Sequence, residues 1–377
     1  MPPRDAEIDP ARLAERLAAL PGIERVREAA AGISAYLVGG AVRDLLLDRD
    51  RADVDVAVEG GGVSELARRL GGAVRAHERF ATAAVRVDGL EVDLAATRSE
   101  TYERPGALPV VSPAPITDDL ARRDFTVNAM AMPLAGAPEL IDPHGGLEDL
   151  RRRQLRVLHD GSFADDPTRA LRAARYAARY GFALERRTAE LLRRADLSTV
   201  STERMEAELR RLASEPEARR GFELVGEWGL VELAPEAPQL VNALAELLTA
   251  EPWRDVVPRQ DAMLAAALGR GVSGARELVA PAPARPSQAV ERARGRSGVE
   301  LALARALGAM WLDRYVAQWR HVRLEIDGND LLAAGVPEGP AVGRGLTRAL
   351  RAKLDGEVAG REQELRAAIA AARENLG

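Results

Sequence analysis

The chain has 377 residues, a net charge of -5, and 46% hydrophobic and 29% charged residues, which is typical of a globular protein with two or three domains. It has no cysteine, which excludes disulfides and thiolate metal sites, and its four histidines show no metal-ligand spacing. No apolar run reaches the ~18 residues of a membrane helix, and the first residues lack the order of a signal peptide. We therefore expect a cytoplasmic protein with no membrane partner, in which any metal is bound by carboxylates.

Short β-like runs alternate with helical runs from about Tyr36 to Pro133, which predicts a mixed sheet with helices. After about Leu147 the strands stop, and periodic helical segments such as LRAARYAARYGF and TERMEAELRRLA follow. The predicted fold class is α+β: a head of mixed sheet and helices, followed by an all-α neck, body and tail. We expect these domains at residues 1–147, 148–214 and 215–377.

The run DVDVAV begins at Asp53 and alternates acidic and apolar residues. In a strand this places Asp53 and Asp55 on one face, with Val54, Val56 and Val58 on the other. Two adjacent carboxylates repel unless a cation lies between them, and oxygen ligands of this kind suit Mg²⁺ together with water and substrate phosphates. A solvated strand edge would explain the DVD pattern alone, but the preceding residues favour a metal site.

Those preceding residues, LVGGAVRDLLL, predict a strand that ends in two glycines and leads into a helix. Gly39 and Gly40 would let the backbone approach a ligand closely, and amides at a helix N-terminus bind anions. Arg43 lies one turn into the helix, where its guanidinium could contact phosphates. A glycine-rich helix start explains the glycines without a ligand, but it does not explain Arg43 and the carboxylates that follow.

A basic segment lies further along this acidic chain, with 17 arginines against 11 acidic residues between Arg151 and Arg220. Within it, helical periodicity places one row of arginines in a single sector: Arg169, Arg172, Arg175 and Arg179. Solvated helix faces normally mix charges, so a row without an intervening acid predicts an anion-binding face. Asp166 stands at the helix start, where capping alone would account for it.

Four ordered blocks resemble the polymerase-beta-like nucleotidyltransferase superfamily, in particular the class II tRNA nucleotidyltransferases and poly(A) polymerases. The first is GGAVRD, with DVD nine residues later. The others are DDLARRDFTVNAMAMPL, DDPTRALRAARYAARYGF and VSTERMEAEL. Together they extend from Val38 to Leu209, about half of the chain.

The resemblance implies a polymerase-beta-like head and an in-line attack of an RNA 3′-hydroxyl on the α-phosphate of a nucleotide. Asp53 and Asp55 would hold two Mg²⁺ ions, one activating the hydroxyl and one neutralising the leaving pyrophosphate. Asp93, on a later strand, is either a helper in catalysis or a solvent-facing aspartate. The residues expected around the nucleotide are Gly39, Gly40, Arg43, Arg122, Arg123, Asp124 and Asn128.

The third block implies recognition of the base by protein side chains. Asp166 and Arg169 would hydrogen-bond the base edge, with Arg172 and Arg175 near the triphosphate or sugar. An aspartate accepts from the exocyclic amine that C and A carry and that U lacks, while an arginine donates to ring or carbonyl acceptors. Asp165 stands where the family usually has glutamate, which weakens the support expected from that residue.

We therefore predict an enzyme that adds CCA to the 3′ end of tRNA from CTP and ATP, with the neck and helical body receiving the acceptor arm. The insertion from Arg98, RSETYERPGALPVVSPAPITDDLA, is full-length, which disfavours CC-only addition, whereas its ETYERPGALP wording leaves A-only addition open. Three alternatives are disfavoured. Poly(A) synthesis would suit a long basic tail, transfer to a small acceptor would not need the basic helix, and an inactive binding module would have lost the carboxylates.

Overall fold

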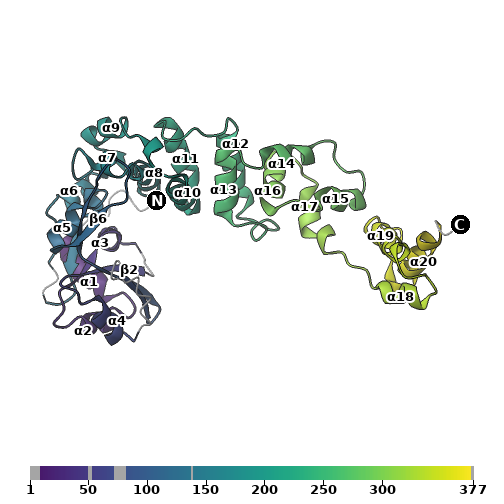
Figure 1. Cartoon of the computed structure of the whole chain (residues 1–377), viewed down its shortest axis with the longest axis horizontal. Coiled ribbons are helices and arrows are strands. Elements are labelled where there is room, and N and C mark those ends of the chain that lie inside the picture. Colours follow the sequence, from purple (N-terminus) through teal and green to yellow (C-terminus); the bar gives the residue numbers. More distant parts are fainter. Residues whose placement is uncertain (1–8, 50–52, 72–81, 137–138, 375–377) are drawn as a thin grey trace. The chain divides into compact units, whose positions relative to one another are not determined.

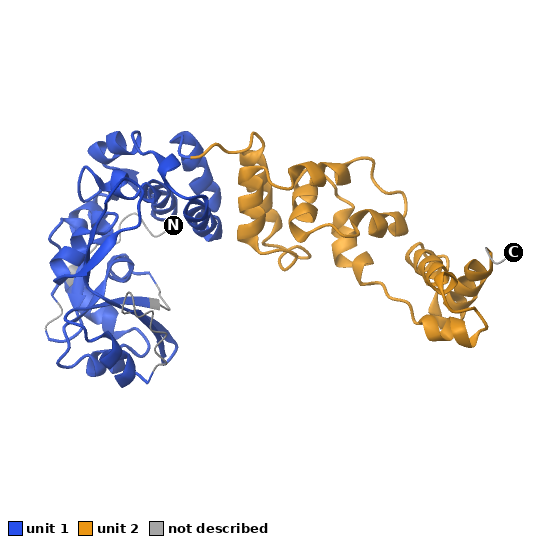
Figure 2. Cartoon of the chain, in the orientation of Figure 1, with its two compact units in different colours: residues 1–230 blue, residues 231–377 orange. Residues whose placement is uncertain are grey.

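The computed structural model describes residues 9–49, 53–71, 82–136 and 139–374, and Figure 1 labels the main elements along the chain. These residues divide into two compact units, 1–230 and 231–377, coloured separately in Figure 2. No described helix is both long enough and apolar enough to cross a membrane.

The first unit is built on a five-stranded mixed sheet in the order β3-β4-β2-β1-β7. Its strands are β1 (Ala35–Val38), β2 (Asp53–Val58), β3 (Thr82–Val87), β4 (Leu90–Ala96) and β7 (Ala131–Pro133). Only β2 and β4 run parallel; the other neighbours are antiparallel. A separate hairpin, β5 (Arg98–Thr101) with β6 (Val110–Pro113), follows β4 directly. The expected mixed sheet and α+β fold are confirmed.

The buried face of β2 is the one that the sequence pattern predicts. Val54, Val56 and Val58 are all at most 1% exposed, while Asp55 is exposed. On the opposite face, Ala57 is covered by α5 (Ile116–Ala121) through Ile116 and Leu120. The acidic face of β2 is therefore closed at the Ala57 end and open at Asp55.

The remaining helices of the first unit flank the sheet or follow it in the chain. They are α1 (Leu13–Ala18), α2 (Ile23–Ala29), α3 (Gly40–Leu46), α4 (Val63–Arg69), α6 (Gly146–Arg151), α7 (Ser162–Asp165), α8 (Thr168–Tyr180), α9 (Arg186–Leu192), α10 (Thr202–Ser214) and α11 (Ala218–Glu227). The expectation that strands stop after Leu147 was wrong in one detail, because β8 (Gln154–Leu155) pairs with β9 (Ala183–Leu184). Helix α11 packs on α8 and α10, and so lies in the first unit, beyond the neck boundary expected at residue 214.

The described residues of the second unit form helices α12 to α20. Their bounds are Ala237–Leu247, Arg259–Leu268, Val272–Val279, Pro286–Ala293, Gly298–Ala306, Leu312–Ala317, Gly328–Ala333, Pro340–Leu354 and Gly360–Arg373. Two local cores are evident. The buried Trp253 donates its indole N–H to Asp313 at 2.7 Å, and Leu331, Ala349 and Ala368 pack together between the last three helices.

Candidate active site

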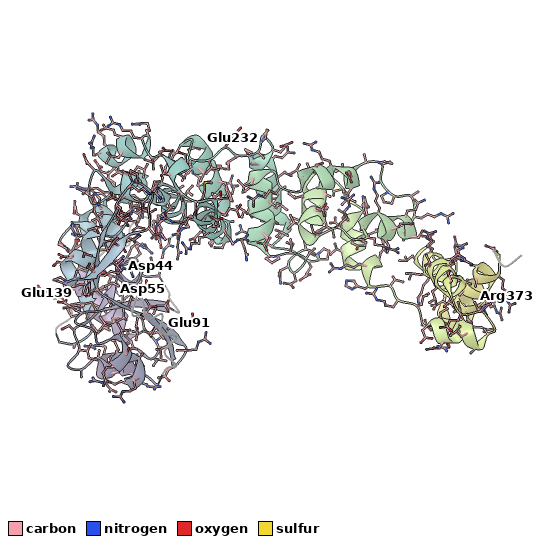
Figure 3. All side chains as sticks on the ribbon, in the orientation of Figure 1. Asp44, Asp55, Glu91, Glu139, Glu232 and Arg373 are labelled. Atoms are coloured by element: carbon pink, nitrogen blue, oxygen red, sulfur yellow. The ribbon has the colours of Figure 1, made fainter. Side chains whose placement is uncertain are left out.

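A cavity of about 490 Å³ in the first unit brings together residues from all four sequence blocks. It lies between the start of α3, strand β2, the β5–β6 hairpin and helices α8 and α10; Figure 3 labels two of its lining residues, Asp44 and Asp55. The predicted residues that line it are Gly40, Arg43, Asp55, Arg122, Arg123, Asp124, Asn128, Asp166, Arg169, Arg172 and Arg175. Sequence positions up to 135 residues apart therefore face one space.

Asp55 and Asp93 are direct register partners on the parallel strands β2 and β4. Paired residues on neighbouring strands lie about 5 Å apart and point to the same face, so two carboxylates emerge side by side. A second cavity, of about 480 Å³, is lined by both of them and shares Asp55, Arg122 and Arg123 with the first. Asp93 thus stands next to Asp55 on the face that opens into these cavities.

This carboxylate pair fits a divalent cation, because Mg²⁺ takes one or two protein carboxylates and completes its shell with water and phosphate oxygens. The backbone of Asp53 lies in β2 opposite Glu91, but its side chain is outside the described structure. Among the described residues, no cluster of three or more acidic or imidazole groups could hold a metal by protein ligands alone. An ion at this site would share its coordination with the substrate.

Gly39 adopts a backbone that only glycine takes readily, with φ of 65° and ψ of -126°. A Cβ there would lie 2.5 Å from Nη1 of Arg123, so the missing side chain also leaves room for that guanidinium. The next residue, Gly40, begins α3 and lines the cavity. The glycine pair thus brings the start of a helix close to a cationic side chain.

Arg43 is only 4% exposed, and its guanidinium is held by three neighbours. It donates from Nε to Asp44 at 2.8 Å, from Nη1 to Asn128, and from Nη2 to the Tyr180 hydroxyl at 2.5 Å. The guanidinium also lies 4.3 Å from the centre of the Tyr180 ring. Arg43 therefore joins α3 to α8 while it lines the cavity, and these three hydrogen bonds use only part of its five-donor fork.

The two arginines of RRDFT are held by a carboxylate that the sequence interpretation did not single out. Asp119, 1% exposed, accepts at 2.8 Å from both Arg122 and Arg123. Burial raises the pKa of Asp119, but Arg123 and Arg122 outweigh that effect, so its pKa lies below the usual value. The sequence did carry a signal for this contact. Arg122 and Arg123 follow Asp119 by three and four residues, and residues at these spacings are neighbours on a helix.

Arg123 keeps donors for a ligand even though Asp119 holds it. Its Nη2 donates to Asp119, whereas its Nη1 makes no hydrogen bond with a described residue, and the side chain lines both cavities. Arg123 is therefore placed to contact an anion in the cavity.

Asp124 links the head to helix α8. Its Oδ2 accepts from Arg172 Nε at 2.8 Å and Nη2 at 2.5 Å, while Oδ1 accepts from the Asn128 amide at 2.8 Å. Burial raises the pKa of Asp124, but Arg172 and Asn128 together lower it to about 2. The carboxylate stays ionised and fixes Arg172 against the head.

The sequence pattern of α8 indicated a row of arginines with no acidic residue opposite it. In the structure, acidic side chains do oppose this row. Glu208 of α10 lies 3.6 Å from Arg172, and Glu215, just after α10, accepts from Arg175 and Arg179 at 3.3 Å each. These acids come from a later segment, so a scan of the helix alone could not find them. The positive charge of the row is therefore partly neutralised, but its guanidinium groups still offer many N–H donors to the cavity.

Asp166 and Arg169 line the cavity together, and each has spare hydrogen-bonding capacity. Oδ1 of Asp166 accepts from the Thr168 backbone at 3.1 Å and from Arg204 at 3.0 Å, whereas Oδ2 has no described partner. Arg169 donates to Ser162 and to the Arg122 carbonyl, which occupies only part of its five-donor fork. An acceptor and N–H donors thus remain side by side.

Asp165, which stands where the family usually has glutamate, has a carboxylate oxygen 3.8 Å from Nε2 of His159.

Comparison with known proteins identifies this architecture. Residues 35–156 match the poly A polymerase head domain. The chain is 37% identical to the CC-adding tRNA nucleotidyltransferase of Deinococcus radiodurans over 359 residues, which cover 90% of this chain and 89% of that protein. The chain belongs to the tRNA nucleotidyltransferase family. Members of this family generally use divalent metals, in agreement with the carboxylate pair.

Other tRNA nucleotidyltransferases similar to this chain differ in specificity and length. The A-adding tRNA nucleotidyltransferase of Geobacter sulfurreducens is 32% identical over 398 residues, covering 89% of this chain and 45% of that protein. The chain thus spans less than half of that relative. The Thermotoga maritima CCA-adding enzyme complexed with tRNA has 26% identity and a TM-score of 0.73, covering 95% of this chain and 98% of the other.

Proposed function

We propose that this tRNA nucleotidyltransferase adds the CCA sequence to the 3′ end of tRNA from CTP and ATP, without a nucleic-acid template. One observation carries the proposal: a single cavity is lined by Asp55 at the open end of β2 and by the Asp166–Arg169 pair of the helical segment. A nucleotide spanning it would have its phosphates near the carboxylates and its base edge near the pair. We also infer that the enzyme acts in the cytoplasm, where it would meet its tRNA substrate.

Asp55 and Asp53 would hold Mg²⁺, with Asp93 beside them on β4. Bound there, the ion would polarise the phosphate and lower the pKa of the attacking 3′-hydroxyl. Arg123, whose Nη1 makes no hydrogen bond with a described residue, would bind the triphosphate together with the backbone around Gly40. Asp93 would assist the metal site or the attacking 3′-hydroxyl, because it is the register partner of Asp55 on the neighbouring strand.

The base would be selected by hydrogen bonds to Asp166 Oδ2 and the remaining N–H groups of Arg169. Cytosine and adenine offer an exocyclic amine to the carboxylate, whereas uracil offers a carbonyl there. The hydrogen bonds among Asp124, Asn128 and Arg172 would hold helix α8 against the head. They would thereby keep the base-contacting pair at the distance from the phosphate site that one nucleotide spans. The second unit, together with the basic segment, would receive the tRNA by phosphate and shape contacts.

The β5–β6 hairpin supports CCA addition over CC-only addition, because the insertion expected to be shortened in CC-adding enzymes is a formed and docked element here. Its residue Gly106 donates to the Ala164 carbonyl at 3.2 Å and accepts from Arg204 at 2.8 Å. A-only addition is the second candidate, because the ETYERPGALP sequence of this insertion leaves it open and an A-adding enzyme is among the relatives of this chain.

The test is incubation of the full chain with tRNAs ending at the discriminator base, at C or at CC, with labelled CTP or ATP. CCA addition predicts incorporation of CTP into the first two substrates and of ATP into the third. Labelling by ATP of the CC-ended tRNA alone would establish A-only addition. If CTP alone is incorporated, the enzyme is CC-adding, and if no tRNA is labelled the proposal fails.

A further inference from the structure

The β5–β6 hairpin places one aromatic side chain at the edge of the cavity. Tyr102 directly follows β5 and lines the cavity together with Pro109, which directly precedes β6. The two strands that flank this segment are paired in register from Arg98 opposite Pro113 to Thr101 opposite Val110. The connecting segment, 102–109, is thus held at both ends where it faces Asp166 and Arg169.

The hydroxyl of Tyr102 is anchored on its own hairpin. It donates at 2.9 Å to Oε2 of Glu100, whose other oxygen accepts from Arg122 at 2.8 Å. Burial raises the pKa of Tyr102, and Glu100 raises it further, so the phenol stays neutral and remains a donor. The anchored hydroxyl fixes the position of the ring without using either of its faces.

The tip of the hairpin docks on the helical segment. Gly106 has φ of 71°, and a Cβ there would lie 2.7 Å from the Thr199 carbonyl oxygen. Arg204 donates both to the Gly106 carbonyl and to Asp166, so one side chain ties the hairpin to the predicted base-reading carboxylate. The hairpin therefore holds Tyr102 in a fixed relation to Asp166.

Tyr102 differs from the other aromatic residue of the cavity, Tyr176. The Tyr176 ring is in contact with Arg175 at 4.5 Å and Arg43 at 5.4 Å, and it meets Phe125 edge-on. Tyr102 makes no ring or cation contact with any described residue. Of the two, Tyr102 is the one whose ring has no aromatic or cationic neighbour among the described residues.

We propose that the Tyr102 ring stacks on the base of the incoming nucleotide while Asp166 and Arg169 contact the edge of that base. The inference rests on the proposed function and adds a binding residue to it. Base–aromatic stacking tolerates any base, because every base has a π face. Tyr102 would therefore strengthen binding of CTP and ATP alike and leave selection to Asp166 and Arg169.

The experiment measures equilibrium binding of CTP and of ATP, and steady-state incorporation into tRNA, for the full-length wild type, Tyr102→Ala and Tyr102→Phe. Tyr102→Ala should weaken the binding of both nucleotides by about 5- to 150-fold, with kcat nearly unchanged at saturating nucleotide. Tyr102→Phe keeps the ring and should restore most of the affinity. Leu108→Ala is the matched control, because Leu108 lies on the same hairpin, is 74% exposed and does not line the cavity.

Wild-type nucleotide affinity in Tyr102→Ala would overturn the inference. So would equal losses in Tyr102→Ala and Leu108→Ala, which would indicate general damage to the hairpin, or a Tyr102→Phe variant as weak as Tyr102→Ala. A rise in the KM for tRNA alone would place the ring on the RNA instead. If the wild type is active and Tyr102→Ala is unaffected, only the stacking proposal is refuted. If the wild type neither binds nor transfers a nucleotide, both proposals are refuted.

Discussion

The carboxylate of Asp124 accepts two hydrogen bonds from Arg172, at 2.8 and 2.5 Å, across 48 residues of sequence. Asp124 lies next to the sheet and Arg172 on helix α8, so this pair fixes the two walls of the cavity against each other. Because the pair is both hydrogen-bonded and charged, it should contribute to the free energy of unfolding in a way that depends on pH.

The Asp124–Arg172 pair should make stability depend on pH. The pKa of Asp124 is about 2 in the folded protein, below its ordinary value of 3.8, so on acidification the unfolded chain takes up the proton first. The stabilisation, roughly 2 kcal/mol, is fully present above about pH 5 and is lost as the pH falls through 4 toward 2. Urea unfolding of wild type and Asp124→Asn should differ most near pH 7 and converge on acidification.

Asp88→Asn is the control for that experiment, because Asp88 is in an exposed ion pair with Arg25. Exposed pairs contribute at most about 1 kcal/mol, so the unfolding free energy of this variant should follow wild type. A gap between wild type and Asp124→Asn that stays constant from pH 7 to pH 3 would contradict the assigned pKa.

Asp55→Asn should abolish nucleotide incorporation while the fold remains intact. Asp55 is an exposed residue of β2, so the substitution removes charge from the site without disturbing the buried valines. The expected loss in kcat/KM is on the order of 10³-fold, because metal coordination contributes several kcal/mol to catalysis. Labelled CTP incorporation and circular dichroism measure the two effects; an active Asp55→Asn enzyme would exclude the metal role.

Asp166→Asn should relax base selection and keep the helix cap. All described contacts of Asp166 fall on Oδ1, so an asparagine can leave its oxygen there and present its amide nitrogen where Oδ2 was. That amine would repel the exocyclic amine of C and A and accommodate the carbonyl of U. We expect discrimination against UTP to fall by about 5- to 150-fold in competition assays. Unchanged selectivity with reduced activity would favour a capping role alone.

Gly39→Ala should lower activity more than Gly32→Ala. Both glycines have positive φ, 65° and 75°, so both substitutions strain the backbone, and the strain is greater at Gly39, whose ψ of -126° lies outside the left-handed helical region. Only at Gly39 would the new Cβ also lie 2.5 Å from Arg123, whereas no atom lies within 4 Å of the Cβ at Gly32. The KM for nucleotide should rise in Gly39→Ala alone. Equal effects in both variants would mean that Arg123 does not bind the nucleotide.

Tyr180→Phe should destabilise the first unit, because its hydroxyl both donates to Asp44 at 3.0 Å and accepts from Arg43 at 2.5 Å in a buried site. Leaving a buried arginine donor without its acceptor costs roughly 1–3 kcal/mol. Thermal unfolding should show the loss, with Tyr315→Phe as the control, since no hydrogen bond of the Tyr315 hydroxyl is described. If the two variants unfold alike, the hydroxyl bridge contributes nothing.

Much of the site could be predicted from local pattern. Alternation in DVDVAV assigned Asp55 to the open face and the valines to the core, because the side-chain period of a strand is two and does not depend on distant residues. Helical periodicity likewise placed Arg169, Arg172 and Arg175 on one sector of α8, and all three line the cavity. These predictions needed only the direction in which each side chain leaves its own element.

The partners of those side chains could not be predicted in the same way. Arg43 lines the cavity as expected, but its hydrogen bond to Tyr180, 137 residues later in the chain, could not be read from the local pattern. The arginine row appeared unopposed because Glu208 and Glu215 lie on or beside another helix.

The sequence by itself determined the mixed sheet of the head, the helical segments that follow it and the family to which the chain belongs. Only the tertiary structure decided which charges are neutralised and which donors remain for a ligand. The physical reason is that periodicity is a local property, whereas the strength of a charge depends on the groups that packing brings within a few ångströms of it. Arg175 illustrates this, since its partner Glu215 lies 40 residues later in the chain and reaches it only through the packing of the helices.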